Sequence, residues 1–221
     1  MRSVRSFATA SSRGSRRERE QAFRSHLVLE AAESVFAAHG FDGVTVEEIA
    51  AKAEVAIATL YKLFGSKEAI FAALVEHRQD EFLLEVETFT RGGATPTDRL
   101  DRLIEGIFRY FEVHGSAFRI YLGATHGFPW RIRSSFGDRA FEKYQQFLGF
   151  LCEQFRAGMD AKAWPRGDPQ RLAVAAMGSI NGLLTHRHIQ QPRPDLAEDI
   201  NFSILLVRRI VGLSSPTPRR R

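Results

Sequence analysis

Apolar side chains recur every three or four positions along most of this 221-residue chain, which is the spacing of one face of an α-helix. Runs that alternate polar and apolar residues, as half-buried strands do, are nearly absent. Ala, Leu, Glu and Arg, which all favour helices, are common throughout. The pattern predicts an all-α protein with helices over 21–39, 46–53, 57–64, 66–89, 96–114, 116–125, 129–163, 168–190 and 195–211.

Glycine and proline divide this series into parts. The stretch RGGATPTD, residues 91–98, interrupts the helical pattern with two glycines and a proline. We expect a boundary near this break, between a smaller and a larger helical domain. The predicted layout is a basic arm over 1–20, a first domain over 21–82, a second over 83–213 and a basic tail over 214–221.

The second and third predicted helices are unusually short. Thr45 is followed three residues later by Glu48, a pairing that predicts a capping box at the start of the helix from Val46. The segment AEVA, residues 53–56, then interrupts the pattern before a helix from Ile57 to Phe64. Two short helices joined by a tight turn are typical of a helix-turn-helix, whose second helix must fit the major groove of DNA.

The stretch from Leu29 to Val75, LEAAESVFAAHGFDGVTVEEIAAKAEVAIATLYKLFGSKEAIFAALV, resembles the DNA-binding domain of the TetR family of bacterial transcriptional regulators. Its most specific elements are T.E.IA..A.V, TLY..F and SKEAIF, in that order and spacing. The resemblance implies an N-terminal three-helix helix-turn-helix domain, followed by a larger helical domain for ligand binding and dimerisation. It also implies a cytoplasmic bacterial protein whose partners are a double-stranded DNA operator, a small-molecule effector and a second copy of the chain.

The resemblance assigns roles to individual residues of the first domain. Thr59 and Tyr61 would bind DNA phosphates through their hydroxyls, and Thr45 would add a phosphate contact to its capping role. Lys67 would bind a phosphate from the start of the fourth helix. A lysine in a first helical turn opposes the helix dipole unless an anion is bound there, which supports this role; the alternative is a side chain that simply extends into solvent. The residues expected to face the groove are Ile57, Ala58, Lys62 and Leu63.

Three positions depart from the family pattern. Glu54 stands in the turn where the family usually has glycine, so either its backbone is left-handed or the turn differs. Ala56 replaces the usual serine cap, and Leu63 replaces a commonly polar residue. We therefore expect apolar contacts with thymine methyl groups to dominate base recognition, with Lys62 as the evident donor to guanine.

The formal charge of +5 does not by itself predict DNA binding. Residues 1–20 carry six Arg and two Glu, a net +4, and Arg219 to Arg221 add +3, which leaves 5 − 7 = −2 for the rest. The Arg- and Ser-rich arm is expected to be disordered, and it could lie along phosphates or in a minor groove. Its composition also resembles a mitochondrial transit peptide.

Aromatic residues suggest an effector site in the second domain. Of the 24 Phe, Trp and Tyr in the chain, 14 lie between Phe108 and Trp164. Ordinary core packing would explain many of them, but their density also suggests a pocket for a largely apolar effector. The hypothetical lining is Phe111, Phe118, Tyr121, Trp130, Tyr144 and Phe147, with His114, His126 or Asn181 as polar anchors.

The last two predicted helices suggest a dimer interface. Small residues at helical spacing on one helix would allow close approach, and the other offers an apolar face. These faces could simply close the domain; the TetR resemblance implies instead that they pair across a two-fold axis. The candidate residues are Ala175, Ser179, Gly182, Ile204, Leu205, Val207 and Ile210.

Other functions receive less support from the sequence. His186 and His188 lie about 200° apart around a helix axis, so they are not expected to bind one metal ion. The sequence has no G-x-S-x-G, no Walker loop and no H-E-x-x-H. Its longest weakly polar stretch, Leu172 to Leu184, is shorter than the roughly 20 residues of a membrane helix. The lone Cys152 suggests a small core residue in a reducing compartment. We expect a non-enzymatic DNA-binding regulator, a dimeric repressor that responds to a ligand. The alternatives are a helical small-molecule-binding protein with weak or lost DNA affinity and a helical enzyme.

Overall fold

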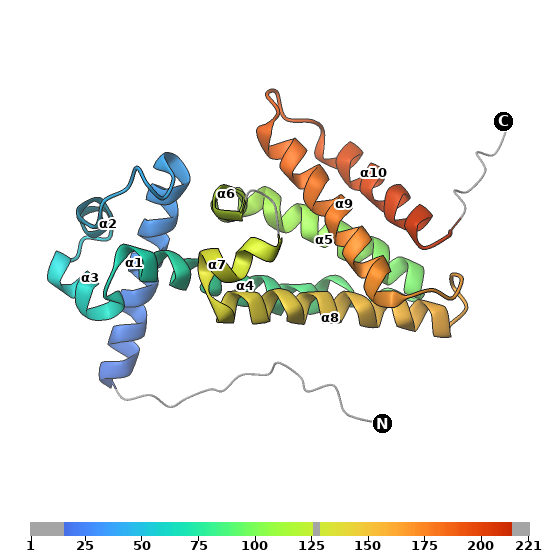
Figure 1. Ribbon diagram of the computed structural model, residues 1–221, viewed down its shortest axis with the longest axis horizontal. Helices are drawn as coiled ribbons and strands as arrows, with labels where there is room; N and C mark the ends of the chain where they lie inside the picture. Colours follow the sequence, from blue (N-terminus) through green and yellow to red (C-terminus); the bar gives the residue numbers. More distant parts are fainter. Residues whose placement is uncertain (1–15, 126–128, 214–221) are drawn as a thin grey trace. The chain divides into compact units, whose positions relative to one another are not determined.

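The computed structural model describes residues 16–125 and 129–213, and these residues contain helices and no β-strand (Figure 1). The chain divides into two compact units, Met1–Leu74 and Val75–Arg221. The division falls inside one helix, α4 (Lys67–Phe89), eight residues before the boundary expected from the sequence. None of the described helices is long and apolar enough to cross a bilayer.

The first unit is built from α1 (Arg16–His39), α2 (Val46–Lys52), α3 (Ile57–Phe64) and the beginning of α4. Helices α1, α2 and α3 pack against one another. The rings of Phe36, Phe41 and Phe71 form a cluster in which each centroid lies 4.9 to 5.9 Å from the others. The other buried apolar side chains of the unit include Val28, Ala32, Val44, Ile49, Leu60, Ile70 and Leu74.

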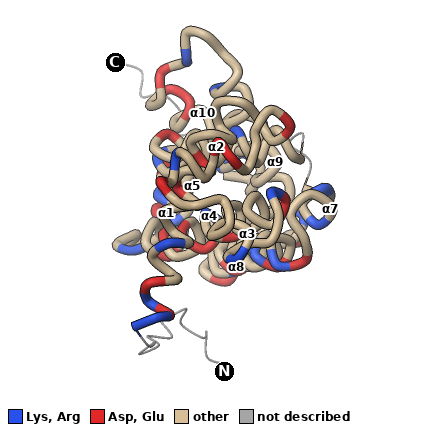
Figure 2. The backbone as a smooth tube through the Cα atoms, turned by 90° about the vertical axis from the view of Figure 1, so that its left-hand side faces the viewer, with Lys and Arg blue, Asp and Glu red and all other residues tan. Residues whose placement is uncertain are grey.

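Helix α1 begins at Arg16, five residues before the expected start, so residues 16–20 of the predicted disordered arm are helical. Basic and acidic residues alternate in these first turns (Figure 2). An ion pair of 2.7 Å between Arg24 and Glu20, one turn apart, favours the helical form. Residues 1–15 and 214–221, the rest of the arm and the tail, lie outside the described residues.

The second unit contains the rest of α4 and a larger set of helices. These are α5 (Pro96–Val113), α6 (Gly115–Thr125), the 3-10 helix η1 (Pro129–Arg131), α7 (Ile132–Phe136), α8 (Asp138–Asp160), α9 (Pro169–Ile189) and α10 (Leu196–Ile210). Three of the long helices begin with side-chain caps: Thr95 forms a capping box with Asp98, and Asp168 and Asp195 each accept two backbone N–H groups. Helices α8 and α10 both pack against α9 (Figure 1).

The prediction of a single helix over 129–163 is wrong. The segment contains η1, α7 and α8 instead, and α8 ends at Asp160. Gly137 separates α7 from α8 with φ of 92°, a left-handed conformation that glycine adopts without a steric cost. Its neighbours have ordinary helical sequences, so the apolar spacing alone gave no sign of the break.

Candidate nucleic-acid interface and effector region

The turn between α2 and α3 is left-handed at Glu54, whose φ is 56°. This is one of the two alternatives that the sequence left open. The amide N–H of Val55 donates to the carbonyl oxygen of Ala50 at 3.0 Å, which closes α2. Ala56 precedes α3 in an extended conformation and provides no side-chain hydrogen bond, as its methyl group predicts. The helix-turn-helix geometry therefore forms without glycine in the turn or a polar cap.

Helix α3 has one buried face and one exposed face. Leu60 is completely buried, which anchors the helix in the first unit. On the opposite side, Ile57 is 40% exposed and Tyr61 50% exposed, one helical turn apart. Ala58 and Lys62 are also exposed, whereas Thr59 and Leu63 are partly buried. The helix thus offers an isoleucine, a phenol and an ammonium group to whatever it meets.

The predicted capping box at Thr45 is present. Its hydroxyl accepts a hydrogen bond from the Glu48 amide at 3.2 Å, and its own amide donates to Oε2 of Glu48 at 2.8 Å. Thr45 is exposed, so its hydroxyl hydrogen can still donate to an external acceptor. This geometry is compatible with the expected phosphate contact.

Lys67 lies in a different environment from the one expected. Its Nζ donates to the carbonyl oxygens of Phe41, at 2.9 Å, and Val44, at 3.0 Å. It also lies 4.4 Å from the centroid of the Phe41 ring. Ser66 caps α4, since its Oγ accepts from the Ala69 amide at 3.1 Å. The ammonium group is therefore bound within its own unit and does not simply extend into solvent.

An aromatic cluster packs against the core of the second unit. Phe82 on α4 contacts the rings of Phe111, at 5.4 Å between centroids, and Phe147, at 5.1 Å. Phe111 contacts Phe118 at 5.0 Å, and Phe118 stacks on Tyr121 at 6.1 Å. Four of the residues proposed as pocket lining thus belong to one cluster with Phe82, which was not among the predicted lining residues.

The other residues proposed for the effector pocket lie in different surroundings from one another. Tyr144 stacks on Phe141 instead, at 6.0 Å, and His114 packs on Tyr110 at 4.4 Å. Burial raises the pKa of Tyr121 to about 12. Asn181 lies on α9 and is half-buried. His126 falls outside the described residues, and only the backbone of Trp130, in η1, is described.

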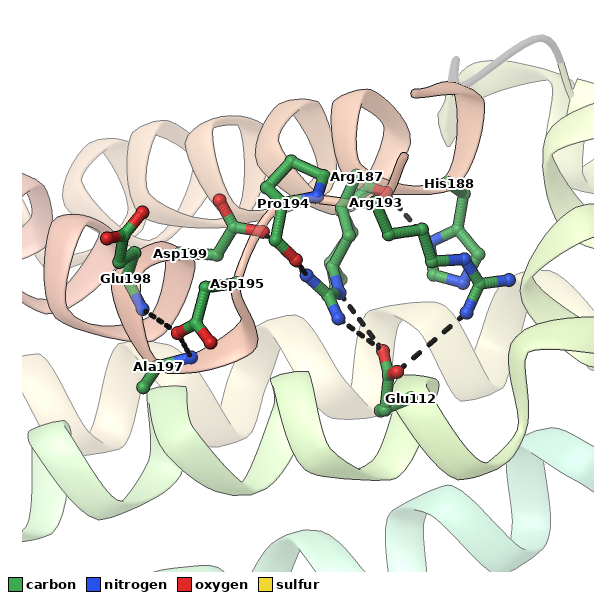
Figure 3. Close-up of polar contacts among 10 residues, drawn as sticks. Glu112, Arg187, His188, Arg193, Pro194, Asp195, Ala197, Glu198 and Asp199 are labelled. Atoms are coloured by element: carbon green, nitrogen blue, oxygen red, sulfur yellow. Dashed lines mark hydrogen bonds and ion pairs between the residues drawn. The ribbon is translucent and has the colours of Figure 1, made fainter. Parts of the chain in front are cut away.

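An ionic network that the sequence did not predict joins α5, α9 and the start of α10 (Figure 3). Arg187 is 4% exposed, and its guanidinium group lies 3.0 Å from carboxylate oxygens of both Glu112 and Asp199. It also donates to the carbonyl oxygen of Pro194. Arg193 lies 3.8 Å from the other oxygen of Glu112. Hydrogen bonds from Arg187 lower the pKa of the Glu112 carboxyl.

His188 lies beside this network. Its Nδ1 lies 2.8 Å from the carbonyl oxygen of Leu184, and its ring packs on Phe118 at 4.8 Å. Burial lowers the pKa of His188, and nearby arginines add to the effect. The Arg187–His188 pair near the end of α9 is a signal that could have drawn attention to this region. The partner of Arg187, Glu112, lies 75 residues earlier in the sequence.

Residues 28–74 match the sequence model of the tetR family of bacterial regulatory proteins. The match spans α1 from Val28, the helix-turn-helix and the first turns of α4. The chain carries a tetR-family domain.

Two relatives of the chain are HTH-type transcriptional regulators. The chain is 32% identical over 87 residues to the HTH-type transcriptional repressor NicS of Pseudomonas putida, which covers 39% of this chain and 41% of NicS. It is 29% identical over 108 residues to the HTH-type transcriptional activator FasR of Mycolicibacterium smegmatis, covering 49% of this chain and 48% of FasR. The chain thus matches less than half the length of each relative.

Solved structures extend the similarity in fold to the second unit. The fatty acid degradation regulator FadR from Bacillus halodurans has a TM-score of 0.75 at 19% identity, covering 87% of this chain and 97% of FadR. FadR from Bacillus subtilis in complex with stearoyl-CoA has a TM-score of 0.72 at 21% identity, covering 86% of this chain and 99% of FadR. The predicted architecture, a tetR-type helix-turn-helix domain followed by a larger helical domain, is confirmed.

The residues that the TetR resemblance suggested for a dimer interface are only partly exposed. Val207 is completely buried in the core of the second unit, so its inclusion in an exposed face is wrong. Leu205 is 40% exposed, and Ala175 and Gly182 are exposed as well. Ser179, Ile204 and Ile210 are partly buried. Exposed apolar residues that the sequence analysis missed are Val174 on α9, 50% exposed, and Phe202 on α10, 57% exposed.

Proposed function

We propose that this protein is a dimeric transcriptional regulator that binds a near-palindromic DNA operator through α3. The observation that carries the proposal is the exposed face of α3 within a matched tetR-family domain. Ile57, Tyr61 and Lys62 project from a short helix that Leu60 holds in place. Leaving an isoleucine and a tyrosine exposed on one turn is unfavourable for a free surface, but apolar contacts with thymine methyl groups and a hydroxyl contact with phosphate would use both.

Within this proposal Tyr61, Thr59 and Thr45 bind phosphates, and Lys62 donates to base edges with Ile57, Ala58 and Leu63 beside it. Lys62 is the exposed cation of α3, and a lysine can donate to the O6 and N7 acceptors of guanine. The hydroxyl of Tyr61 can donate to a phosphate oxygen. Phosphate contacts would set affinity and orientation, whereas Lys62 and its apolar neighbours would set base preference.

A second copy of the chain would complete the operator-binding unit. The exposed Val174 on α9 and Phe202 and Leu205 on α10 support a paired apolar face between two subunits. Gly182 on α9 has open space where a side chain would stand, which favours close approach of a partner helix. A two-fold axis would place the two α3 helices about 34 Å apart, one turn of DNA.

The effector is proposed to be a small, largely apolar molecule bound in the second unit, near the cluster of Phe82, Phe111, Phe118 and Phe147. The cluster offers aromatic surface, and Tyr121 and His188 beside it offer polar groups. The stearoyl-CoA bound to FadR of Bacillus subtilis makes long-chain acyl thioesters the first class to test. Effector binding would release the operator, and its differential affinity for the two conformers sets the size of the response, typically about 1 to 3 kcal/mol.

The direction of regulation is proposed to be repression. NicS is a repressor and FasR an activator, so these relatives include both directions. Transcription of a reporter from the selected operator, with and without the protein, tests the direction. Higher expression in the presence of the protein would overturn repression while leaving DNA binding intact.

The test of DNA binding starts from a random-sequence duplex pool and from genomic fragments. Duplexes recovered with the protein are measured by fluorescence anisotropy in moderate salt. Tyr61→Phe is expected to weaken binding about equally for all sequences, and Lys62→Ala to alter base preference. The control Arg102→Ala removes an exposed charge from α5 in the second unit, away from the proposed dimer face, and should change neither. The reverse assignment of the two effects would contradict the proposed roles.

A second candidate is a helical small-molecule-binding protein with little DNA affinity. The left-handed Glu54 and the missing side-chain cap at Ala56 favour it, because both weaken the helix-turn-helix relative to a glycine turn and a serine cap. Stearoyl-CoA, with free coenzyme A as the control, separates the candidates. Under the first proposal stearoyl-CoA raises the melting temperature and releases DNA; under the second it raises the melting temperature of a protein that recovers no duplex from either pool.

A further inference from the structure

Lys67 occupies the first position of α4 and turns back toward the loop between α1 and α2. Its Nζ lies 2.9 Å from the carbonyl oxygen of Phe41 and 3.0 Å from that of Val44. The face of the Phe41 ring lies 4.4 Å away. An ammonium group has three N–H donors, so two carbonyl oxygens and one aromatic face occupy most of its directions.

We propose that Lys67 is a positioning residue for DNA binding, and that it fixes the loop over 40–45 to the first turn of α4 instead of contacting a phosphate. The inference rests on the proposed function, because it explains how Thr45 and the start of α2 are held for the operator. It replaces the phosphate role that the family resemblance implied for Lys67.

The groups that bind Lys67 are themselves held in place. Val44 is 2% exposed, so its carbonyl oxygen cannot move without disturbing the core. The Phe41 ring packs on Phe36 and Phe71, at 5.9 and 4.9 Å between centroids. Thr45 follows Val44 directly and caps α2. A chain of contacts therefore joins the first turn of α4 to the hydroxyl that is proposed to bind phosphate.

The electrostatics of the helix end support the same role. A lysine in a first helical turn is unfavourable beside the positive end of the helix dipole unless negative charge lies nearby. The two carbonyl oxygens supply that partial negative charge from within the unit. Binding to DNA is therefore not needed to explain a lysine at this position. A displacement of the first turn of α4 would carry the loop with it, because Lys67 is hydrogen-bonded to both Phe41 and Val44.

The test compares Lys67→Met with two matched lysine variants of the same unit. Lys62→Met removes the exposed lysine of α3 that is proposed to reach the groove, and Lys52→Met removes an exposed lysine from the last turn of α2. Two quantities are measured on the full chain: amide hydrogen exchange across residues 41–46, which needs no DNA, and the salt dependence of affinity for a duplex selected from the random pool. Each phosphate contact contributes about 0.9 to the slope of log affinity against log salt.

For Lys67→Met we expect faster exchange at residues 41–46, unchanged exchange in α9 and α10, about a tenfold loss of affinity and an unchanged salt slope. Lys52→Met should leave loop exchange unchanged. A slope reduced by about 0.9 per subunit with unchanged loop exchange would overturn the inference in favour of a phosphate contact. Unchanged exchange together with unchanged affinity would also overturn it.

If Lys67→Met does not fold, Lys67→Gln is measured in the same way. The glutamine amide keeps N–H donors but carries no charge. A positioning role therefore predicts a smaller increase in loop exchange for Lys67→Gln than for Lys67→Ala. A phosphate role predicts that both variants have the same salt slope, reduced relative to the wild type. Should the wild-type chain recover no duplex, the proposed function fails, while the exchange measurements still decide whether Lys67 fixes the loop.

Discussion

Arg187 and Glu112 form a paired contact between α9 and α5, in which Nε and Nη2 of the arginine both lie 3.0 Å from one carboxylate oxygen. Arg187 is 4% exposed, so its charge depends on this partner and on Asp199. Removing one partner of a buried charge costs more than the contact itself contributes, because the remaining charge stays buried. The pair is therefore a sensitive point of the second unit.

We expect Glu112→Gln to lower the free energy of unfolding by about 1 to 3 kcal/mol, measured by urea denaturation at neutral pH. The control Glu105→Gln, on the same helix, removes an exposed ion pair with Arg109 and should cost less than about 1 kcal/mol. The pKa of Glu112 is lowered in the folded state, so its contribution is present at neutral pH and is lost as the pH falls below the ordinary value of 4.5. Equal effects of the two variants would contradict the special role of the buried pair.

His188 should make stability depend on pH in a higher range. Its pKa is lowered from the ordinary 6.5 in the folded state, so the unfolded chain binds a proton more readily. Stability should therefore decrease as the pH falls below 6.5. His188→Gln is expected to flatten this slope in urea denaturation between neutral and mildly acidic pH. His186→Gln, on the exposed side of the same helix, is the matched control.

Two glycines of α8 should respond to alanine in opposite directions. A Cβ at Gly158 would lie 1.8 Å from a ring carbon of Trp164, which is 4% exposed and donates through Nε1 to the carbonyl oxygen of Phe155. Gly158→Ala should destabilise the protein by about 1 to 3 kcal/mol or prevent folding. Gly149 has no neighbour within 4 Å of its Cβ position, so Gly149→Ala should stabilise by up to about 1 kcal/mol. Thermal unfolding of both variants is the measurement, and destabilisation by Gly149→Ala would contradict the open environment.

The left-handed Glu54 predicts a stabilising substitution in the first unit. Glu54→Gly should raise the free energy of unfolding by about 1 kcal/mol, because glycine adopts φ of 56° without steric cost. Glu54→Ala removes the same charge but keeps the steric cost, so it separates the two effects. If both variants raise the free energy of unfolding by the same amount, the loss of charge explains the change and the backbone conformation does not.

The proposed dimer face can be tested with charged substitutions. Phe202→Glu and Leu205→Glu should convert a dimer to monomers in sedimentation at micromolar concentration, because an unpaired carboxylate would be buried between subunits. Leu84, on α4, is 58% exposed and lies outside the proposed face, so Leu84→Glu is the matched control. A wild-type protein that sediments as a monomer would contradict the face directly.

Local signals in the sequence predicted the first unit well. The capping box at Thr45 and the interrupted pattern at 53–56 placed α2 and α3, because caps and turns depend on residues close in the chain. The break at Gly137 was missed, since glycine can either continue a helix at a cost or end it. At position 54, where the family usually has glycine, the sequence left open a left-handed Glu54 or a different turn, and the structure has the left-handed conformation.

Contacts between distant residues could not be predicted in the same way. Lys67 binds carbonyl oxygens 23 and 26 residues earlier, and Arg187 pairs with Glu112 75 residues earlier. Each depends on where the helices pack, and no spacing rule specifies that. For the same reason Val207, which continues an apolar helix face, was expected at an interface and instead lies in the core.

Hydrogen bonds to main-chain carbonyl oxygens hold helix α4 within each of the two units. In the second unit, Nζ of Lys143 donates to the carbonyl oxygen of Glu76 at 2.8 Å, and the hydroxyl of Tyr110 donates to that of Arg78 at 3.3 Å. In the first unit, Nζ of Lys67 donates to the carbonyl oxygens of Phe41 and Val44 in the loop over 40–45. Since every residue type supplies a carbonyl oxygen, the side chains at 76 and 78 can be exchanged without removing these acceptors. Phe41 and Val44 are more constrained, because the Phe41 ring also contacts Lys67 and Val44 is buried in the core. Substitutions at Glu76 and Arg78 could therefore adapt α4 to a new operator or a new inducer while both hydrogen bonds to its main chain remain.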